Sequence, residues 1–220
     1  MIPPQGNAEF VAAMERVLDV YRRPYDPARP VVCMDETPRQ LIREVHVPIP
    51  ARPGQCERHD YEYQRCGVCN VFMASEPLAG RRITKVTERK TKVDWAHFLH
   101  DIAAAYPNAS LITLVMDNLS THSPGALYEA YPPAQAKALW DRFEFVYTPK
   151  HGSWLNVAEI ELNVMIGQCL KRRIDSIAEL RDEVTAWQAQ RDRLQAKVNW
   201  QFTTDDARVK LKRLYPTFDL

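Results

Sequence analysis

Several features that would assign a chain to a familiar class are missing from this sequence. No apolar run approaches the ~18 residues that a membrane-spanning helix needs, and the N-terminal stretch MIPPQGNAEF lacks the basic and apolar regions of a signal peptide. An excess of charge of one sign is also missing, since 29 lysines and arginines oppose 28 aspartates and glutamates. These absences predict a cytosolic protein, in which any nucleic-acid surface must be sought in local patches.

A disulfide framework is missing as well, because five cysteines without regular spacing favour reduced thiols. Four residues nevertheless form a C-x2-H…C-x2-C pattern of zinc-ligand types, namely Cys56, His59, Cys66 and Cys69. Cys66 and Cys69 fall inside a predicted strand, where residues three apart point to opposite faces. Only a bulge or turn at Gly67 would bring them together. Buried free thiols are therefore the prediction, and a structural zinc ion is the alternative.

What the sequence does contain is enough apolar material for one large domain with an extension. Residues 8–21 have apolar side chains at helical spacing and predict a short amphipathic helix that stands alone before the main fold. The proline-rich stretch 22–30 predicts a linker. The expected organisation is an N-terminal helix and linker in 1–30, the main domain in 31–174 and a helical extension in 175–220.

Within this domain, the periodicity of apolar residues predicts strands at 30–37, 61–77, 81–90, 111–118 and 143–149. Predicted helices lie at 93–106, at 123–142 with a break at Pro132 and Pro133, and after residue 155. A further long helix is predicted at 175–194, in the extension. Three antiparallel strands followed by alternating helices and strands match the α/β, ribonuclease H-like (retroviral integrase-like) arrangement, a five-stranded mixed sheet flanked by helices. Its first and fourth strands are neighbours.

Three carboxylates stand where this arrangement would gather them. Asp35 and Asp117 each end a hydrophobic run that predicts a buried strand, and Glu159 lies on a helix that follows a polar loop. Taken singly, such acids are most often turn caps or exposed surface groups. Together they form an oxygen-only cluster of the kind that suits Mg²⁺. Two such ions roughly 4 Å apart activate a hydroxyl or water on one side of a phosphorus and stabilise the leaving oxygen on the other.

Four motifs carry a resemblance to a known family: MDET, MDNLSTHSP, YTPKHGSWLNVAEIEL and WQFTTDDARVKLKRLYP. Together they resemble the catalytic half of a bacterial insertion-sequence transposase of the mariner-like superfamily, over residues 8–216. The resemblance implies that Asp35, Asp117 and Glu159 are the DDE triad and hold two Mg²⁺ ions, for which Mn²⁺ would substitute. The 42-residue interval between Asp117 and Glu159 is longer than is usual in the superfamily, and extra helical residues around 132–140 would absorb the excess.

The resemblance also implies an activity and partners. Such enzymes cleave double-stranded DNA at the terminal inverted repeats of the transposon and join the freed end to target DNA, commonly at TA, and we expect a homodimer on DNA in the bacterial cytoplasm and nucleoid. Basic residues near the proposed site are expected to contact DNA: Arg89, Lys90, Lys92, His122, Lys150 and His151. For His122, orienting Asp117 and a satisfied loop histidine are equally open alternatives.

Helix-turn-helix modules, which members of this superfamily carry ahead of the catalytic domain, are not evident here. We therefore expect a shortened chain or one product of a split or decayed reading frame. Two other functions stay open: a catalytically silent DNA-binding or assembly protein that acts as a transposition inhibitor, and a stand-alone ribonuclease H-like nuclease.

The choice between Glu159 and Glu161 follows from helical geometry. An apolar stripe is predicted to contain Leu155, Ala158, Leu162 and Ile166. Glu159 flanks this stripe, whereas Glu161 lies about 200° away from Glu159 on a helix that turns about 100° per residue. Glu161 is therefore expected to be exposed, and its substitution by glutamine to lower catalysis only severalfold.

Overall fold

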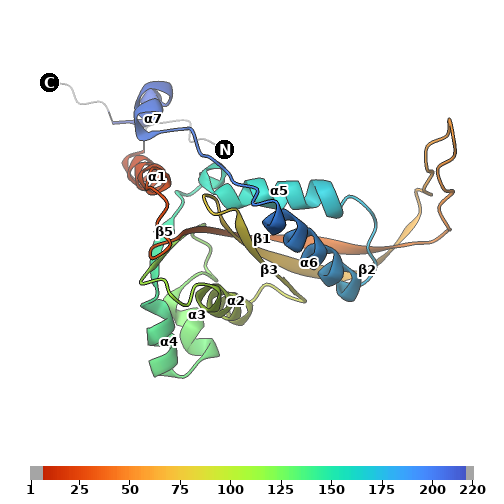
Figure 1. Ribbon diagram of the computed structural model, residues 1–220, viewed down its shortest axis with the longest axis horizontal. Coiled ribbons are helices and arrows are strands. Elements are labelled where there is room, and N and C mark those ends of the chain that lie inside the picture. The colour runs from red at the N-terminus through yellow and green to blue at the C-terminus, as the bar shows by residue number, and fades with distance from the viewer. Residues whose placement is uncertain (1–6, 217–220) are drawn as a thin grey trace.

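A five-stranded mixed sheet forms the centre of the structure, a computed structural model that describes residues 7–216 (Figure 1). The strands are β1 (Val31–Glu44), β2 (Tyr63–Glu76), β3 (Arg81–Thr87), β4 (Ile112–Met116) and β5 (Phe143–Tyr147). Their spatial order is β3-β2-β1-β4-β5, with β1, β2 and β3 antiparallel and β1, β4 and β5 parallel. The predicted meander and the predicted contact between the first and fourth strands are therefore confirmed.

Seven α-helices lie within the described residues, and two 3₁₀ turns accompany them. The helices are α1 (Ala8–Tyr21), α2 (Lys92–Ala105), α3 (Pro124–Ala130), α4 (Pro133–Trp140), α5 (Val157–Cys169), α6 (Ile177–Arg193) and α7 (Thr204–Lys210), and the turns are η1 (Ser153–Leu155) and η2 (Lys212–Leu214). Helices α2, α3 and α4 pack on one face of the sheet, and α5 and α6 pack on the other. The break between α3 and α4 falls at Pro132, as predicted from the sequence.

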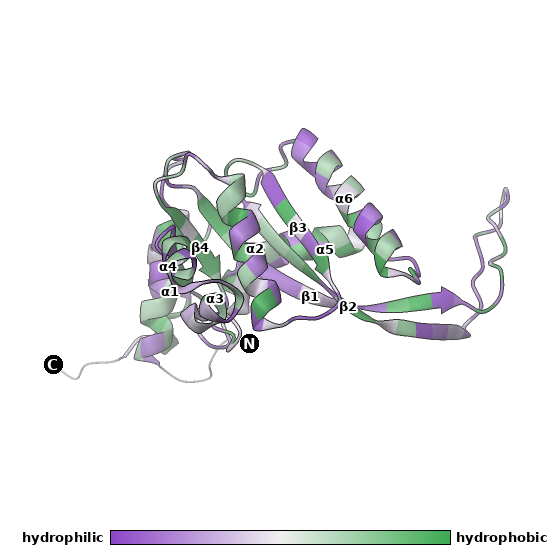
Figure 2. Cartoon of the chain, turned by 90° about the horizontal axis from the view of Figure 1, so that it is seen from below, coloured by the Kyte–Doolittle hydropathy of each residue, from purple (hydrophilic) through white to green (hydrophobic). Residues whose placement is uncertain are grey.

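β1 is buried on both faces, because its side chains alternate between two cores. Val32 and Met34 lie in the core beneath α2, whereas Cys33 lies in the core that α1 and α5 share. β4 beside it is buried along its whole length and has the green, apolar colour in Figure 2. Asp35, the next residue, therefore belongs to the α5 side of the sheet.

β1 extends much further than its apolar run, and the prediction that it ends at residue 37 is wrong. Its pairing with β4 ends at Cys33, but its pairing with β2 continues to Glu44. Beyond Cys33 the strand has no neighbour on the β4 side, which is why Pro38, a residue without an N–H donor, is tolerated there. The far end of this hairpin projects from the body of the molecule (Figure 1).

α1 does not stand alone, which corrects the expectation for the N-terminal helix. Its residues Met14, Val17 and Leu18 are completely buried in a core that also contains Val115 of β4 and Val146 of β5. An amphipathic helix must cover its apolar face, and here the sheet edge and the C-terminal segment cover it. Glu15 of α1 accepts hydrogen bonds from Arg208 of α7.

None of the helices within residues 7–216 combines the length and the apolar character that crossing a bilayer requires.

Candidate active site

Asp35 and Asp117 meet where β4 ends. The parallel register pairs Cys33 with Val115, so that continuing it by two residues sets Asp117 beside Asp35. β4 itself ends at Met116, and the chain leaves the sheet at that point. The two aspartates therefore share the edge of the sheet at which parallel strands end, a common place for ligand sites in α/β folds.

Glu159 is brought to this edge by the start of α5, which is fixed at several points. Asn156 is the N-cap: its Oδ1 accepts from the N–H of Ala158 at 3.1 Å, and its Nδ2 donates to the main-chain oxygen of Met34 at 2.8 Å. The Tyr21 hydroxyl donates to the main-chain oxygen of Leu155 at 2.7 Å. Glu159 lies in the first turn of the helix fixed in this way, half-buried.

The three predicted acids interact electrostatically. Burial, together with the negative charges of Glu36, Asp117 and Glu159, raises the pKa of Asp35 to about 7 against the opposing effect of a hydrogen bond from the N–H of Glu36. An acid at the surface would not be affected in this way, because solvent would screen its neighbours. Asp35, Asp117 and Glu159 thus lie near enough to one another for their charges to interact.

His122 is buried in the protein next to Asp117 rather than exposed at the surface. Its side chain is 1% exposed, its Nδ1 is 2.7 Å from Oδ1 of Asp117, and its ring stacks on Trp95. Burial alone would lower the pKa of His122, but its contacts with Asp117 and Glu36 outweigh burial and raise that pKa to about 9. Burial likewise favours protonated Asp117, yet the bond from His122 outweighs it and lowers the pKa of Asp117. This burial argues against the predicted direct DNA contact, and the side chain contacts Asp117 instead.

Glu36 and Lys90 form ion pairs that continue from His122. The carboxylate of Glu36 lies 3.4 Å from Nε2 of His122 and 3.1 Å from Nζ of Lys90, and its side chain is almost fully buried. Lys90 also contributes to the lowered pKa of Asp117. Sequence reasoning missed Glu36 as a partner of His122, although its position next to Asp35 in a strand places it on the opposite face of the sheet.

Asn156 was missed in the same way, although an asparagine just before an apolar helical pattern is a recognised N-cap signal. Its second bond, to Met34, joins segments far apart in the sequence, and no local pattern indicates it.

The donor set consists of carboxylate oxygens, which fits a hard divalent cation in chemical type. Within residues 7–216, however, no three His, Cys, Asp or Glu side chains are arranged closely enough to hold a metal ion as they stand. Asp117 is turned instead toward His122.

The zinc-ligand pattern is dispersed in the structure. β2 has a register shift at Gly67, as the zinc alternative required. Cys69 nevertheless points into an apolar core and lies near the main-chain oxygen of Arg39, whereas Cys66 lies near the oxygen of Gln64. Cys56 is exposed in the loop between β1 and β2.

The other predicted DNA contacts lie on loops or, for Lys92, at the first residue of α2. Because β1, β3, β4 and β5 run in the same direction, the segments that follow β3 and β5 leave the sheet on the same side as Asp117. They carry exposed basic side chains, namely Arg89, Lys90, Lys92, Lys150 and His151. His151 adopts a left-handed backbone conformation with φ 64°.

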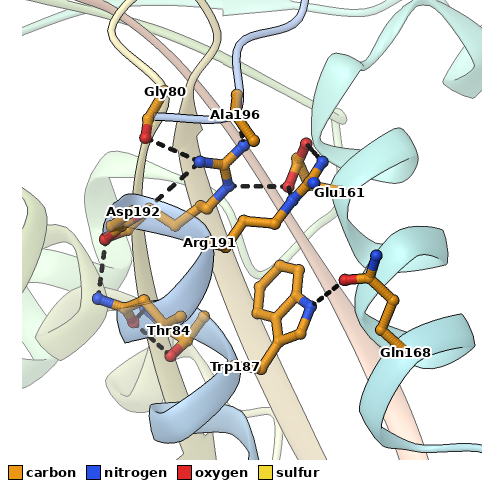
Figure 3. Close-up of polar contacts among 10 residues, drawn as sticks. Gly80, Thr84, Glu161, Gln168, Trp187, Arg191, Asp192 and Ala196 are labelled. Atoms are coloured by element: carbon orange, nitrogen blue, oxygen red, sulfur yellow. Dashed lines mark hydrogen bonds and ion pairs between the residues drawn. The ribbon is translucent and has the colours of Figure 1, made fainter. Parts of the chain in front are cut away.

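Glu161 contradicts the helical-wheel prediction. It is completely buried, not exposed, and accepts from Arg82 of β3 and Arg191 of α6 (Figure 3). Burial favours its protonated form, but these two guanidinium groups outweigh burial and lower the pKa of Glu161. Met165, rather than the partly exposed Ile166, continues the buried stripe of α5.

Comparison with solved structures identifies the same fold in Mos1, a mariner transposase. A Mos1 paired end complex with Mn superposes with a TM-score of 0.59 at 17% identity, over 89% of this chain and 60% of that one. The Mos1 strand transfer complex gives 0.58 at 15% identity, over 86% and 55%. The isolated Mos1 catalytic domain gives 0.57 at 14% identity, over 89% of both chains. The chain thus spans about 60% of the longer Mos1 chain but nearly all of its catalytic domain, and the predicted ribonuclease H-like fold is confirmed.

Curated protein sequences show no significant match. A family model does: the one described as DDE superfamily endonuclease matches residues 30–181, which contain Asp35, Asp117 and Glu159. Since this match covers well over half of the chain and includes the edge of the sheet where the three acids meet, the protein belongs to the DDE superfamily of endonucleases.

Proposed function

We propose that this chain is the catalytic domain of an insertion-sequence transposase, which cleaves DNA at the ends of the element and transfers the freed strand to a target. The observation that supports the proposal is geometric: Asp35 and Asp117 lie where β4 ends, and Glu159 lies in the first turn of α5, which Asn156 bonds to β1. Family membership and the ribonuclease H-like fold support it.

Each residue has a part in the proposed reaction. Asp35, Asp117 and Glu159 would hold Mg²⁺, or Mn²⁺ in its place, and bound divalent ions supply activation of the attacking oxygen and stabilisation of the leaving oxygen at phosphorus. His122 holds Asp117 ionised and in one orientation, and Glu36 holds the other nitrogen of His122. Supporting residues of this kind are typical of metal sites and usually decide the orientation of the ligands.

DNA would lie along the loops that follow β3 and β5. Arg89, Lys92 and Lys150 are exposed there and suit phosphate oxygens, which attract lysine and arginine without regard to sequence. The Mos1 structures are paired-end and strand-transfer complexes, which supports two copies of this chain acting on two DNA ends, with TA as the proposed target.

The deciding experiment incubates the purified chain with Mg²⁺ or Mn²⁺, a labelled duplex from the DNA that flanks its gene, and a target rich in TA. Nicked ends together with joined products support a transposase. Cleavage without joining would indicate a stand-alone nuclease, and DNA binding without cleavage a silent assembly protein. The Asp35→Asn variant and a random duplex are the controls, and equal cleavage by that variant would contradict the proposal.

A further inference from the structure

We propose that Glu161 is a positioning residue for Glu159: an ion-paired latch with Arg82 and Arg191 that fixes the rotation of α5 and so aims Glu159 at the two aspartates. This inference rests on the proposed function, because it assigns Glu159 to the metal-binding group.

The latch has three hydrogen bonds. Oε2 of Glu161 accepts from Nε of Arg82 at 2.8 Å and from Nε of Arg191 at 3.2 Å, and Oε1 accepts from Nη2 of Arg191 at 3.0 Å. Both oxygens of the carboxylate are therefore engaged, from two directions. A side chain held in this way cannot turn without breaking at least one charge-assisted bond.

Arg82 fixes the latch to the rest of the molecule. Its guanidinium also donates to the main-chain oxygens of Gly80 and Ala196, and it lies 3.5 Å from Asp192. Gly80 has φ 68°, and a Cβ there would meet the carbonyl carbon of Gln195 at 2.6 Å, so only glycine lets the β2–β3 turn approach the end of α6. Arg82 thus joins the β2–β3 turn, α5, α6 and the segment after α6, and its partners Gly80, Glu161, Asp192 and Ala196 are labelled in Figure 3.

α6 is bonded to both of its neighbours independently of the latch. Trp187 donates to Gln168 of α5 at 2.8 Å, and Gln188 accepts from the N–H of Thr84 in β3 at 2.9 Å. Arg191 is therefore presented to Glu161 by a helix that cannot drift along the sheet. Arg191 and Ala196 both lie outside residues 30–181, so the C-terminal segment completes the support of the catalytic helix.

A buried charge cluster is poor evidence for stability alone, because apolar residues of similar size often stabilise a core as well or better. The cluster instead fixes the orientation of α5. Asn156 and Tyr21 fix the first turn of α5, and the Glu161 latch fixes the side of the next turn that faces β3 and α6. Glu159 lies between these two anchors, and the helix can neither slide nor rotate in the span that carries it.

The test measures Mn²⁺ binding directly, by the loss of the free-ion electron paramagnetic resonance signal, for the full chain and three variants. Glu161→Gln keeps the shape and removes the charge. Arg191→Gln removes two of the three bonds at a side chain that is 21% exposed, so it is the milder change if Glu161→Gln fails to fold. Glu144→Gln is the matched control, because it breaks the ion pair with Arg23, away from α5.

Both latch variants are expected to bind Mn²⁺ about tenfold more weakly, at the lower end of the effects of residues that support metal ligands, and to bind DNA as before. Glu144→Gln should keep the Mn²⁺ affinity even if its melting temperature falls. Folded latch variants with unchanged Mn²⁺ affinity would overturn the latch alone. If the wild-type chain binds no Mn²⁺, or if Asp35→Asn does not weaken its Mn²⁺ binding, the proposed function is contradicted, and the latch with it.

Discussion

The side chain of Asn156 bonds α5 to β1 within one residue of Asp35, because its Nδ2 donates to the main-chain oxygen of Met34 at 2.8 Å. The same side chain caps α5 through Ala158. One amide thus sets the distance between the strand that carries Asp35 and the helix that carries Glu159.

Asn156→Asp separates these two tasks. A carboxylate still caps the helix and suits its N-terminal dipole, but it cannot donate to Met34 and meets that oxygen with like charge. We expect the free energy of unfolding to fall by about 1–3 kcal/mol, the usual penalty of an unsatisfied buried group, and cleavage to fall further. Urea denaturation and cleavage rates measure the two effects. Asn7→Asp, at the N-cap of α1, is the control and should be nearly neutral.

Asp35→Asn should abolish cleavage and stabilise the metal-free chain at high pH. Folding raises the pKa of Asp35 from 3.8 to about 7, so the wild type loses stability as pH rises through that interval and the carboxylate ionises. The neutral amide escapes this loss. The melting temperature of the variant in EDTA should exceed that of the wild type at pH 8, and the difference should shrink at pH 5. A larger advantage at pH 5 would contradict the assignment.

His122→Gln should lower cleavage at least about tenfold, in the range typical of residues that orient metal ligands, without weakening DNA binding. The reason is that the buried imidazole contacts Asp117 and not the surface. Cleavage rates and DNA titrations with the same labelled duplex measure both quantities. His100→Gln, at an exposed histidine on α2, should change neither. Lost DNA affinity with normal cleavage would restore the surface role for His122.

Glu144→Gln tests an ion pair that no proposed chemistry uses. The hydrogen bond from Arg23 lowers the pKa of Glu144 from 4.5 to about 2. The stability that this pair contributes is therefore present above pH 4.5 and is lost as pH falls toward 2. The variant should melt below the wild type at pH 7, with a smaller difference at pH 3. A difference that is constant with pH would mean that the effect comes from packing.

DNA binding should be weak, sensitive to salt and nearly independent of sequence, because Arg89, Lys92 and Lys150 suit phosphates and not base edges. Replacing any one by alanine should reduce the slope of log affinity against log salt by about one. Titrations at two salt concentrations with flanking and random duplexes measure this. Lys137→Ala, at an exposed lysine paired with Asp141 on α4, should leave the slope unchanged. Strong preference for one duplex at high salt would contradict the prediction.

The sequence predicts most of the fold because apolar periodicity and prolines are local signals. The limits of α1 and the start of β3 agree with the predicted ones, and Pro132 separates α3 from α4. The length of β1 escaped prediction, since residues beyond Asp35 pair only with β2 and have no continuous apolar run.

The candidate site, like the fold, could be predicted only in part. Asp35, Asp117 and Glu159 follow from strand and helix positions and from family motifs, whereas Glu161 does not. An acid on a helix indicates an exposed residue unless its cationic partners are known, and Arg82 and Arg191 lie 79 and 30 residues away in the sequence. An ion pair between residues far apart in the sequence produces no periodic pattern from which it could be predicted.

The contacts between α1 and α7 also determine when the molecule can finish folding. Thr204 bonds to Asp19 and Arg208 to Glu15, across 185 and 193 residues. A ribosome adds about 5–20 residues per second, so α1 waits roughly 10–40 s for the segment that completes its packing. During that time the apolar face around Met14 and Leu18 is open to chaperones or to other nascent chains. Substitutions in α7 should accordingly lower the yield of folded protein during synthesis before they affect any chemistry at the sheet edge.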